Sequence, residues 1–126
     1  MSTTTTTTTT NPPRRLAQIV RLKPSSLQEY KACHAAVWPA VLAQIKDSNI
    51  ADYSIFLDEG RMTLFATMKY VGGDFEADMQ RMSENPEVRR WWEMTDGMQE
   101  SFVEGSQGSL DPRGWWTGLE EVFRLE

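Results

Sequence analysis

The chain has 126 residues, a length that suits one domain with a modest core, and a formal net charge of −5 at pH 7. The acidic balance argues against nucleic acid and against an anionic membrane surface as partners. No apolar stretch approaches the ~20 residues of a membrane span.

Cysteine and histidine usage narrows the chemistry further. Cys33 is the single cysteine and His34 the single histidine. One of each cannot form the usual His/Cys metal cages, so we expect no metal site. The lone cysteine excludes an internal disulfide and fits a reducing compartment, and the N-terminus lacks the apolar core of a signal peptide. We therefore expect a cytoplasmic protein.

The N-terminus is of low complexity. Residues 3–10 are eight consecutive threonines, and Asn11-Pro12-Pro13 follow. A segment without apolar groups cannot drive its own burial. We predict a disordered Thr-rich tail over residues 1–13 and a single domain over residues 14–126.

The first part of the domain predicts a strand and a helix. Leu16–Leu22 is β-branched at its centre, which favours a strand. Ser26 and Glu29 have the spacing of a capping box and predict the start of the helix. Pro39 lies inside the helical pattern and predicts a kink or a restart just before it, because proline lacks a backbone donor and clashes one turn back.

The middle of the chain predicts a hairpin. Ile50–Leu57 and Met62–Val71 are strand-like, and a short turn at Asp58–Arg61 joins them in an antiparallel pair. A helix is then expected from Asp74 to about Ser83.

The C-terminal part predicts one more helix and one more strand. Asn85 is a favourable N-cap, and Pro86 suits the first position of a helix that continues to about Met98. Residues 102–118 are rich in Gly, Ser and Asp and predict a long loop. Glu120–Leu125 is the predicted last strand.

The order of elements predicts the fold class. β-α-β-β-α-β with a split second helix is the ferredoxin-like pattern, an α+β fold with a four-stranded antiparallel sheet and its helices on one face. Both faces of that sheet carry apolar residues, so a second copy of the chain is the natural cover and we expect a homodimer. The apolar strand residues are Leu16, Ile19, Ile55, Phe56, Leu64, Phe65, Val122 and Phe123.

His34 lies between two aromatic residues at helical spacing, Tyr30 and Trp38. Positions i, i+4 and i+8 fall on one helix face. Imidazole exchanges protons near neutral pH, and flat aromatic surfaces suit ring-shaped ligands. The stretch therefore fits either a small proton-transfer site or a core face whose histidine is simply hydrogen-bonded.

Several motifs resemble those of the L-rhamnose mutarotase family. The resemblance covers residues 16–126, and its most specific parts are H-x-x-V-W-P and R-W-W-x-x-M-T-D. The quoted segments are Glu29–Pro39, Asp52–Asp58, Arg90–Met98 and Leu119–Phe123. The resemblance implies a ferredoxin-like dimer that interconverts the α and β anomers of L-rhamnose without a cofactor or metal.

The resemblance also implies roles for five residues. His34 matches the catalytic acid/base, Tyr30 and Tyr53 match sugar-contacting tyrosines, and Trp91 and Trp92 match a tryptophan pair at the sugar. From the residues alone, each tyrosine could equally be a core residue with a bonded hydroxyl. Neighbouring helical positions point ~100° apart, so one tryptophan is expected to face the core and the other the ligand.

The chain departs from the family pattern in two places. Cys33-His34-Ala35-Ala36 stands where family members often have Arg-His-Asn-Pro, and Trp115 and Trp116 in the long loop have no assignable counterpart. These departures leave the sugar open, L-rhamnose or a close 6-deoxy hexose. Two other functions remain open at this point, a non-catalytic binding protein for a small ring ligand and a cofactor-free monooxygenase, because fold alone does not fix function.

Overall fold

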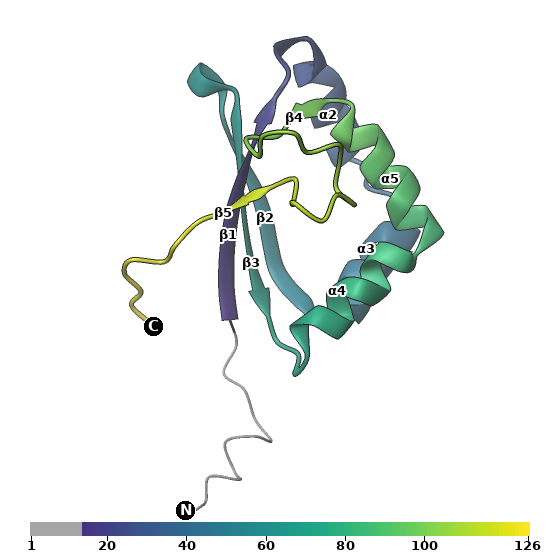
Figure 1. The fold of residues 1–126 in the computed structure, drawn as a ribbon, viewed down its shortest axis with the longest axis vertical. Helices are drawn as coiled ribbons and strands as arrows, with labels where there is room; N and C mark the ends of the chain where they lie inside the picture. Colours follow the sequence, from purple (N-terminus) through teal and green to yellow (C-terminus); the bar gives the residue numbers. More distant parts are fainter. Residues whose placement is uncertain (1–13) are drawn as a thin grey trace, which may run out of the picture.

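The computed structural model describes residues 14–126, so the tail predicted at residues 1–13 lies outside the described residues. Within 14–126, one antiparallel sheet is covered on one face by helices (Figure 1). The strands are β1 (Arg14–Leu22), β2 (Ile50–Asp58), β3 (Thr63–Tyr70), β4 (Gln99–Glu100) and β5 (Thr117–Gly118). The helices are α2 (Leu27–His34), α3 (Pro39–Asp47), α4 (Phe75–Glu84) and α5 (Pro86–Asp96), with 3-10 turns η1 (Pro24–Ser26) and η2 (Glu59–Arg61).

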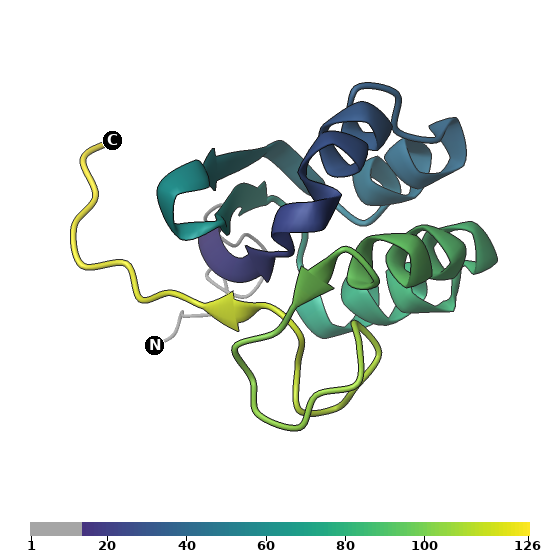
Figure 2. The same ribbon diagram turned by 90° about the horizontal axis from the view of Figure 1, so that it is seen from above.

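The sheet is curled, and its helices lie in two pairs. The strand order is β2-β3-β1-β4, and β5 also pairs with β1. Seen from above, α2 and α3 form one pair and α4 and α5 the other, both on the same side of the sheet (Figure 2). The even-numbered residues of β1 and β3 face the helices, which buries Val20, Leu22, Leu64, Ala66 and Met68.

The prediction for the first helix is half confirmed. Pro39 does start a new helix, because its missing N–H and fixed φ suit the first helical position. The expected capping box is wrong, since Ser26 makes no side-chain cap bond and the Leu27 N–H bonds the Pro24 carbonyl instead. The expected i, i+8 stacking of Trp38 is also wrong, because Trp38 is the extended residue between α2 and α3.

The predicted last strand, Glu120–Leu125, is wrong. The Leu119 N–H still bonds the Ala17 carbonyl, but residues 120–126 then leave the sheet, as Figure 1 shows. Val122 and Phe123 are 88% and 80% exposed. The strand positions beside β1 are filled by the short β4 and β5. Apolar side chains favour a strand only where a partner lies alongside, and residues 14–119 supply none here.

Candidate functional site

His34 occupies the last position of α2, beside Tyr30 one turn earlier. The two rings stack with their centroids 4.1 Å apart and an interplanar angle of 27°. The His34 Nδ1 lies 2.9 Å from the Tyr30 backbone oxygen. Because a carbonyl oxygen can only accept, Nδ1 is the protonated nitrogen of the neutral ring and Nε2 keeps its lone pair.

The second aromatic partner of His34 comes from α5. Trp91 meets the imidazole edge to face at 5.2 Å and meets Trp38 in the same way at 5.1 Å. Trp91 is 6% exposed. α5 begins where Asn85 accepts from the N–H groups of Glu87 and Val88, as the sequence predicts, and this start sets the helical phase that aims Trp91 at α2.

Burial sets the charge of the imidazole. It lowers the pKa of His34 below its ordinary 6.5, and the bond to the Tyr30 carbonyl opposes this in part. The ring is therefore mostly neutral at pH 7 and can take a proton at Nε2. The geometry and the charge state together suit a general base.

The Tyr30 hydroxyl is one end of a buried chain of hydrogen bonds. Gln99, 3% exposed, donates its Nε2 to the Tyr30 oxygen at 3.2 Å and accepts from the Trp115 indole N–H at 2.8 Å. Burial first, and Tyr53 second, raise the pKa of Tyr30, so its hydroxyl stays protonated at neutral pH. Tyr30 is thus both a core residue and a member of the site.

A β-bulge places Tyr53. Asp52 has a positive φ of 50°, and the register of β2 against β3 shifts between Ala51 and Ser54. Arg15 holds the bulge through an ion pair with Asp52 at 3.2 Å. The shift returns Ile55 to the core side of the sheet. Tyr53 is 38% exposed as a whole residue, yet burial of its hydroxyl raises its pKa to about 12.

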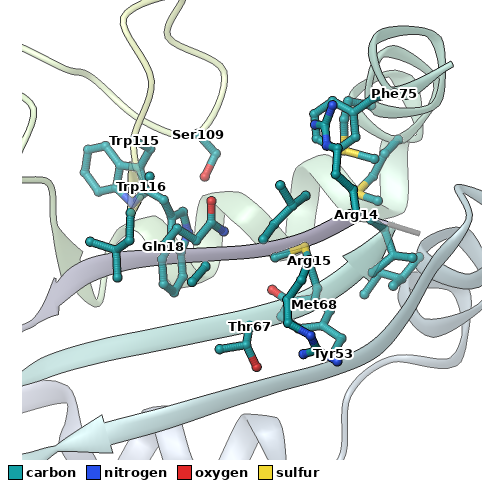
Figure 3. Close-up of a pocket in the computed structure, with 18 of the residues that line it drawn as sticks. Arg14, Arg15, Gln18, Tyr53, Thr67, Met68, Phe75, Ser109, Trp115 and Trp116 are labelled. Atoms are coloured by element: carbon teal, nitrogen blue, oxygen red, sulfur yellow. The ribbon is translucent and has the colours of Figure 1, made fainter. Parts of the chain in front are cut away.

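The five predicted site residues line two different cavities. Tyr30 and His34 line a cavity of about 330 Å³ beside Phe56 and Leu57. The others, Tyr53, Trp91 and Trp92, line a cavity of about 630 Å³ between the sheet, the helices and the loop before β5 (Figure 3). Trp91 connects the two sets through its contact with His34. Both tryptophans line the larger cavity, Trp91 as a buried residue and Trp92 as a half-buried one.

The long loop completes the larger cavity and was underestimated from the sequence. The core has two clusters of buried residues, one that contains Val20, Leu22 and Tyr30 and one that contains Ile50, Ala66 and Met68, and Trp116 packs against both. Trp115 and Ser109 line the cavity with it. Asp96 fixes the loop by accepting from the Ser109 N–H at 2.7 Å and from its hydroxyl at 2.6 Å. The paired tryptophans indicate this packing in the sequence, because two large apolar side chains in an otherwise polar loop are expected to be buried against the domain.

Gln99 and Gln18 were missed altogether. Gln99 lies in a two-residue strand that the sequence places at the end of a helix, where no periodicity marks its burial. Gln18 is a polar residue at a core-facing position of β1 and lines the larger cavity. Gln18 has the same even-numbered spacing along the strand as Val20 and Leu22, which predicts that all three point to the same face.

Two absences hold for the described part of the chain. Residues 14–126 contain no group of three or more His, Cys, Asp or Glu side chains that could hold a metal ion. Over the same residues, every helix is too short or too polar to cross a membrane.

Comparison with known proteins identifies the family. The family model described as L-rhamnose mutarotase matches residues 15–125. An L-rhamnose mutarotase of Phocaeicola vulgatus is 40% identical over 105 residues, covering 83% of this chain and 91% of the relative. One from Listeria monocytogenes serotype 4b is 36% identical over 111 residues, covering 88% and 97%.

The fold agrees with the sequence comparison. The crystal structure of an L-rhamnose mutarotase from Formosa agariphila superimposes with a TM-score of 0.67 at 31% identity, covering 90% of this chain and 99% of that one. The family match, the identities and the structural likeness all extend over nearly the whole described domain. The chain belongs to the L-rhamnose mutarotase family.

Proposed function

We propose that this protein interconverts the α and β anomers of L-rhamnose, with His34 as the acid/base. The family assignment supports the reaction, and one observation supports the residue. The His34 Nδ1 is occupied by the Tyr30 carbonyl, which leaves the Nε2 of a mostly neutral imidazole free to take a proton. A non-catalytic binding protein and a cofactor-free monooxygenase are not favoured by any of the relatives named above.

The reaction needs proton transfer, cleavage and re-formation of one C–O bond, and a bond rotation. In the proposed first step His34 Nε2 removes the proton of the anomeric hydroxyl, the bond from the anomeric carbon to the ring oxygen breaks, and the ring oxygen receives a proton relayed by a phenol hydroxyl or water. The product of this step is the open aldehyde. Rotation of the aldehyde carbon and reversal of the same transfers close the ring on the other face. Such a positioned acid/base supplies about two to four orders of magnitude.

The tyrosines and tryptophans have distinct proposed roles. Tyr53 keeps its proton at neutral pH, because burial raises its pKa to about 12. Its hydroxyl can therefore donate a hydrogen bond to the sugar or relay the second proton. Tyr30 supports the imidazole by stacking. Trp91 and Trp92 provide the flat apolar surface on which the C–H face of a sugar lies.

Exchange spectroscopy by proton NMR tests the proposal. Freshly dissolved α-L-rhamnose is followed with and without the protein, and the anomeric signals report the rate of exchange. Faster exchange supports the mutarotase, whereas ligand shifts without faster exchange point to binding alone. A panel that includes L-fucose, a 6-deoxy hexose, and L-mannose, which has the 6-hydroxyl, identifies the preferred sugar. Oxygen uptake with an electron-rich aromatic substrate would indicate the monooxygenase.

We also propose a ferredoxin-like homodimer in the cytoplasm. The strand order β2-β3-β1-β4 with helices on one face supports the classification. On the opposite face, Phe56 pairs across the sheet with Phe65, and the two are 61% and 36% exposed. The C-terminal segment runs on the side of the sheet away from the helices (Figure 2), and its Val122, Phe123 and Leu125 are at least 80% exposed. Apolar surface of this extent supports a covering second copy.

A further inference from the structure

Gln18 is a polar residue on the apolar, helix-facing side of the sheet. It lies on β1 one inward position before Val20, which is fully buried in the core cluster that contains Tyr30. Its neighbours across the sheet are Ala66 on β3 and Gly118 on β5. Because both neighbours are small, the row at Gln18 leaves space around the amide. Figure 3 shows the amide in the larger cavity, beside Trp116 and Ser109.

The Gln18 amide has no partner in the part of the chain that the structure describes. No hydrogen bond within residues 14–126 engages its oxygen or nitrogen, and no buried side-chain polar atom there lacks a partner. The amide is therefore open to the cavity rather than sealed in the core. Two other polar groups at the cavity wall are already engaged, Ser109 by Asp96 and Arg15 by Asp52.

We propose that Gln18 binds a hydroxyl group of the sugar and sets which hydroxyl pattern the enzyme accepts. The proposal rests on the mutarotase function argued above and assigns a specificity residue to the same site. An amide offers one acceptor and two donor hydrogens, so it can pair with vicinal hydroxyls that both donate and accept. Specificity in a mostly apolar pocket comes from a few such polar groups.

The position of Gln18 suits a contact remote from the reacting atoms. Gln18 lines the same cavity as Tyr53, Trp91 and Trp92, and it is not in the lining of the cavity that His34 shares with Tyr30. Trp91 joins the two by its contact with the His34 ring. In the proposed complex the amide meets the part of the sugar that lies against Tyr53 and the tryptophans, away from the anomeric carbon at His34. A group of this kind holds the ground state and the transition state alike, so its loss raises KM and leaves kcat nearly unchanged.

The test replaces Gln18 by methionine, which keeps the length and removes the hydrogen bonds. Gln18→Met is expected to raise KM for L-rhamnose about tenfold, the effect of a lost amide–hydroxyl pairing, with kcat nearly unchanged. Gln28→Met is the matched control, because Gln28 is exposed on α2. Thermal melts of both variants check that each is folded.

Monodeoxy sugars identify the contact. The wild type is compared with Gln18→Met on the 2-deoxy, 3-deoxy and 4-deoxy analogues of L-rhamnose. For one analogue, the kcat/KM of the wild type should be about tenfold lower than for L-rhamnose. With Gln18→Met, the same analogue and L-rhamnose should give equal values of kcat/KM. The proposal is overturned if the variant keeps the KM of the wild type. It is also overturned if, for every analogue, the effect of the variant on kcat/KM simply adds to the effect of removing the hydroxyl.

Sugar binding by isothermal titration separates this inference from the proposed function. If the wild type binds L-rhamnose but does not speed anomer exchange, the mutarotase proposal fails. In that case, weaker binding by Gln18→Met and unchanged binding by Gln28→Met would still support Gln18 as a sugar contact. Equal binding by the wild type and both variants would overturn it.

Discussion

The Nδ1 of His34 lies 2.9 Å from the backbone oxygen of Tyr30, and the two rings stack at 4.1 Å. The contact uses the i, i+4 spacing of α2 twice, once through the backbone and once through the rings. It fixes the tautomer and the orientation of the imidazole before any ligand arrives. The chain has no second histidine, so the proposed proton transfers depend on one imidazole. Holding that imidazole in its reactive orientation before the sugar binds favours the transfer.

The first prediction concerns pH. Burial lowers the pKa of His34, so the neutral ring is the favoured form in the folded protein. We expect the catalysed exchange rate to be flat through neutral pH and to fall only below about pH 6.5. NMR exchange rates, corrected for buffer catalysis at each pH, measure this. A catalysed rate that increases on acidification would contradict the assignment of a neutral base.

The second prediction concerns Tyr53. Tyr53→Phe keeps the ring at the bulge and removes the hydroxyl. We expect anomer exchange to slow at least about tenfold, equivalent to about 1.4 kcal/mol, because the hydroxyl bonds the sugar or relays a proton. Urea unfolding should change little, since the residue is 38% exposed. Unchanged exchange together with a large loss of stability would assign Tyr53 to the core instead.

Local spacing explains how much of this site could be predicted. Tyr30 and His34 stack because four residues separate them on one helix, and any helix would bring them together. Trp38 lies near this pair for a different reason, because it packs against Trp91 on α5. Contacts between helices distant in sequence have no local pattern. The Gln99 bridge between Tyr30 and Trp115 is of this kind, and the sequence offers no sign of it.

The third prediction tests that bridge. Gln99→Leu removes one amide and leaves the Tyr30 hydroxyl and the Trp115 indole N–H without their partner. We expect the free energy of unfolding to fall by about 2 kcal/mol or more, because each buried unpaired group costs about 1–3 kcal/mol. Chemical denaturation gives the value. Trp115→Phe, which removes the indole donor and leaves the bond from Gln99 to Tyr30, separates the contribution of that bond from that of the indole. A stability of Gln99→Leu equal to the wild type would show that the bridge contributes nothing.

The C-terminal segment shows the limit of strand prediction. Glu120–Leu125 has the composition of a strand, but Val122, Phe123 and Leu125 are each at least 80% exposed in the single chain. Strand propensity reports the fit to a half-buried pleated surface, and it does not say which chain supplies that surface. The long strands β1, β2 and β3 were predictable because each has its partner within the same chain, β2 and β3 as a hairpin and β1 alongside β3.

The fourth prediction concerns assembly. Light scattering at micromolar concentration should give twice the mass of one chain, because the open face of the sheet and residues 119–126 expose apolar side chains. Deleting residues 120–126 should weaken the dimer and shift the mass toward one chain. A wild-type protein that is monomeric and fully active would contradict the expected dimer.

The most direct test of the central claim is the anomer exchange rate of His34→Asn. Asparagine keeps a polar group of similar shape but cannot exchange protons near pH 7. Catalysed exchange of L-rhamnose should fall by about two or more orders of magnitude, the usual contribution of a positioned acid/base, while the melting temperature stays nearly constant. A variant that keeps most of the wild-type exchange rate would contradict the mechanism and require a different catalytic residue.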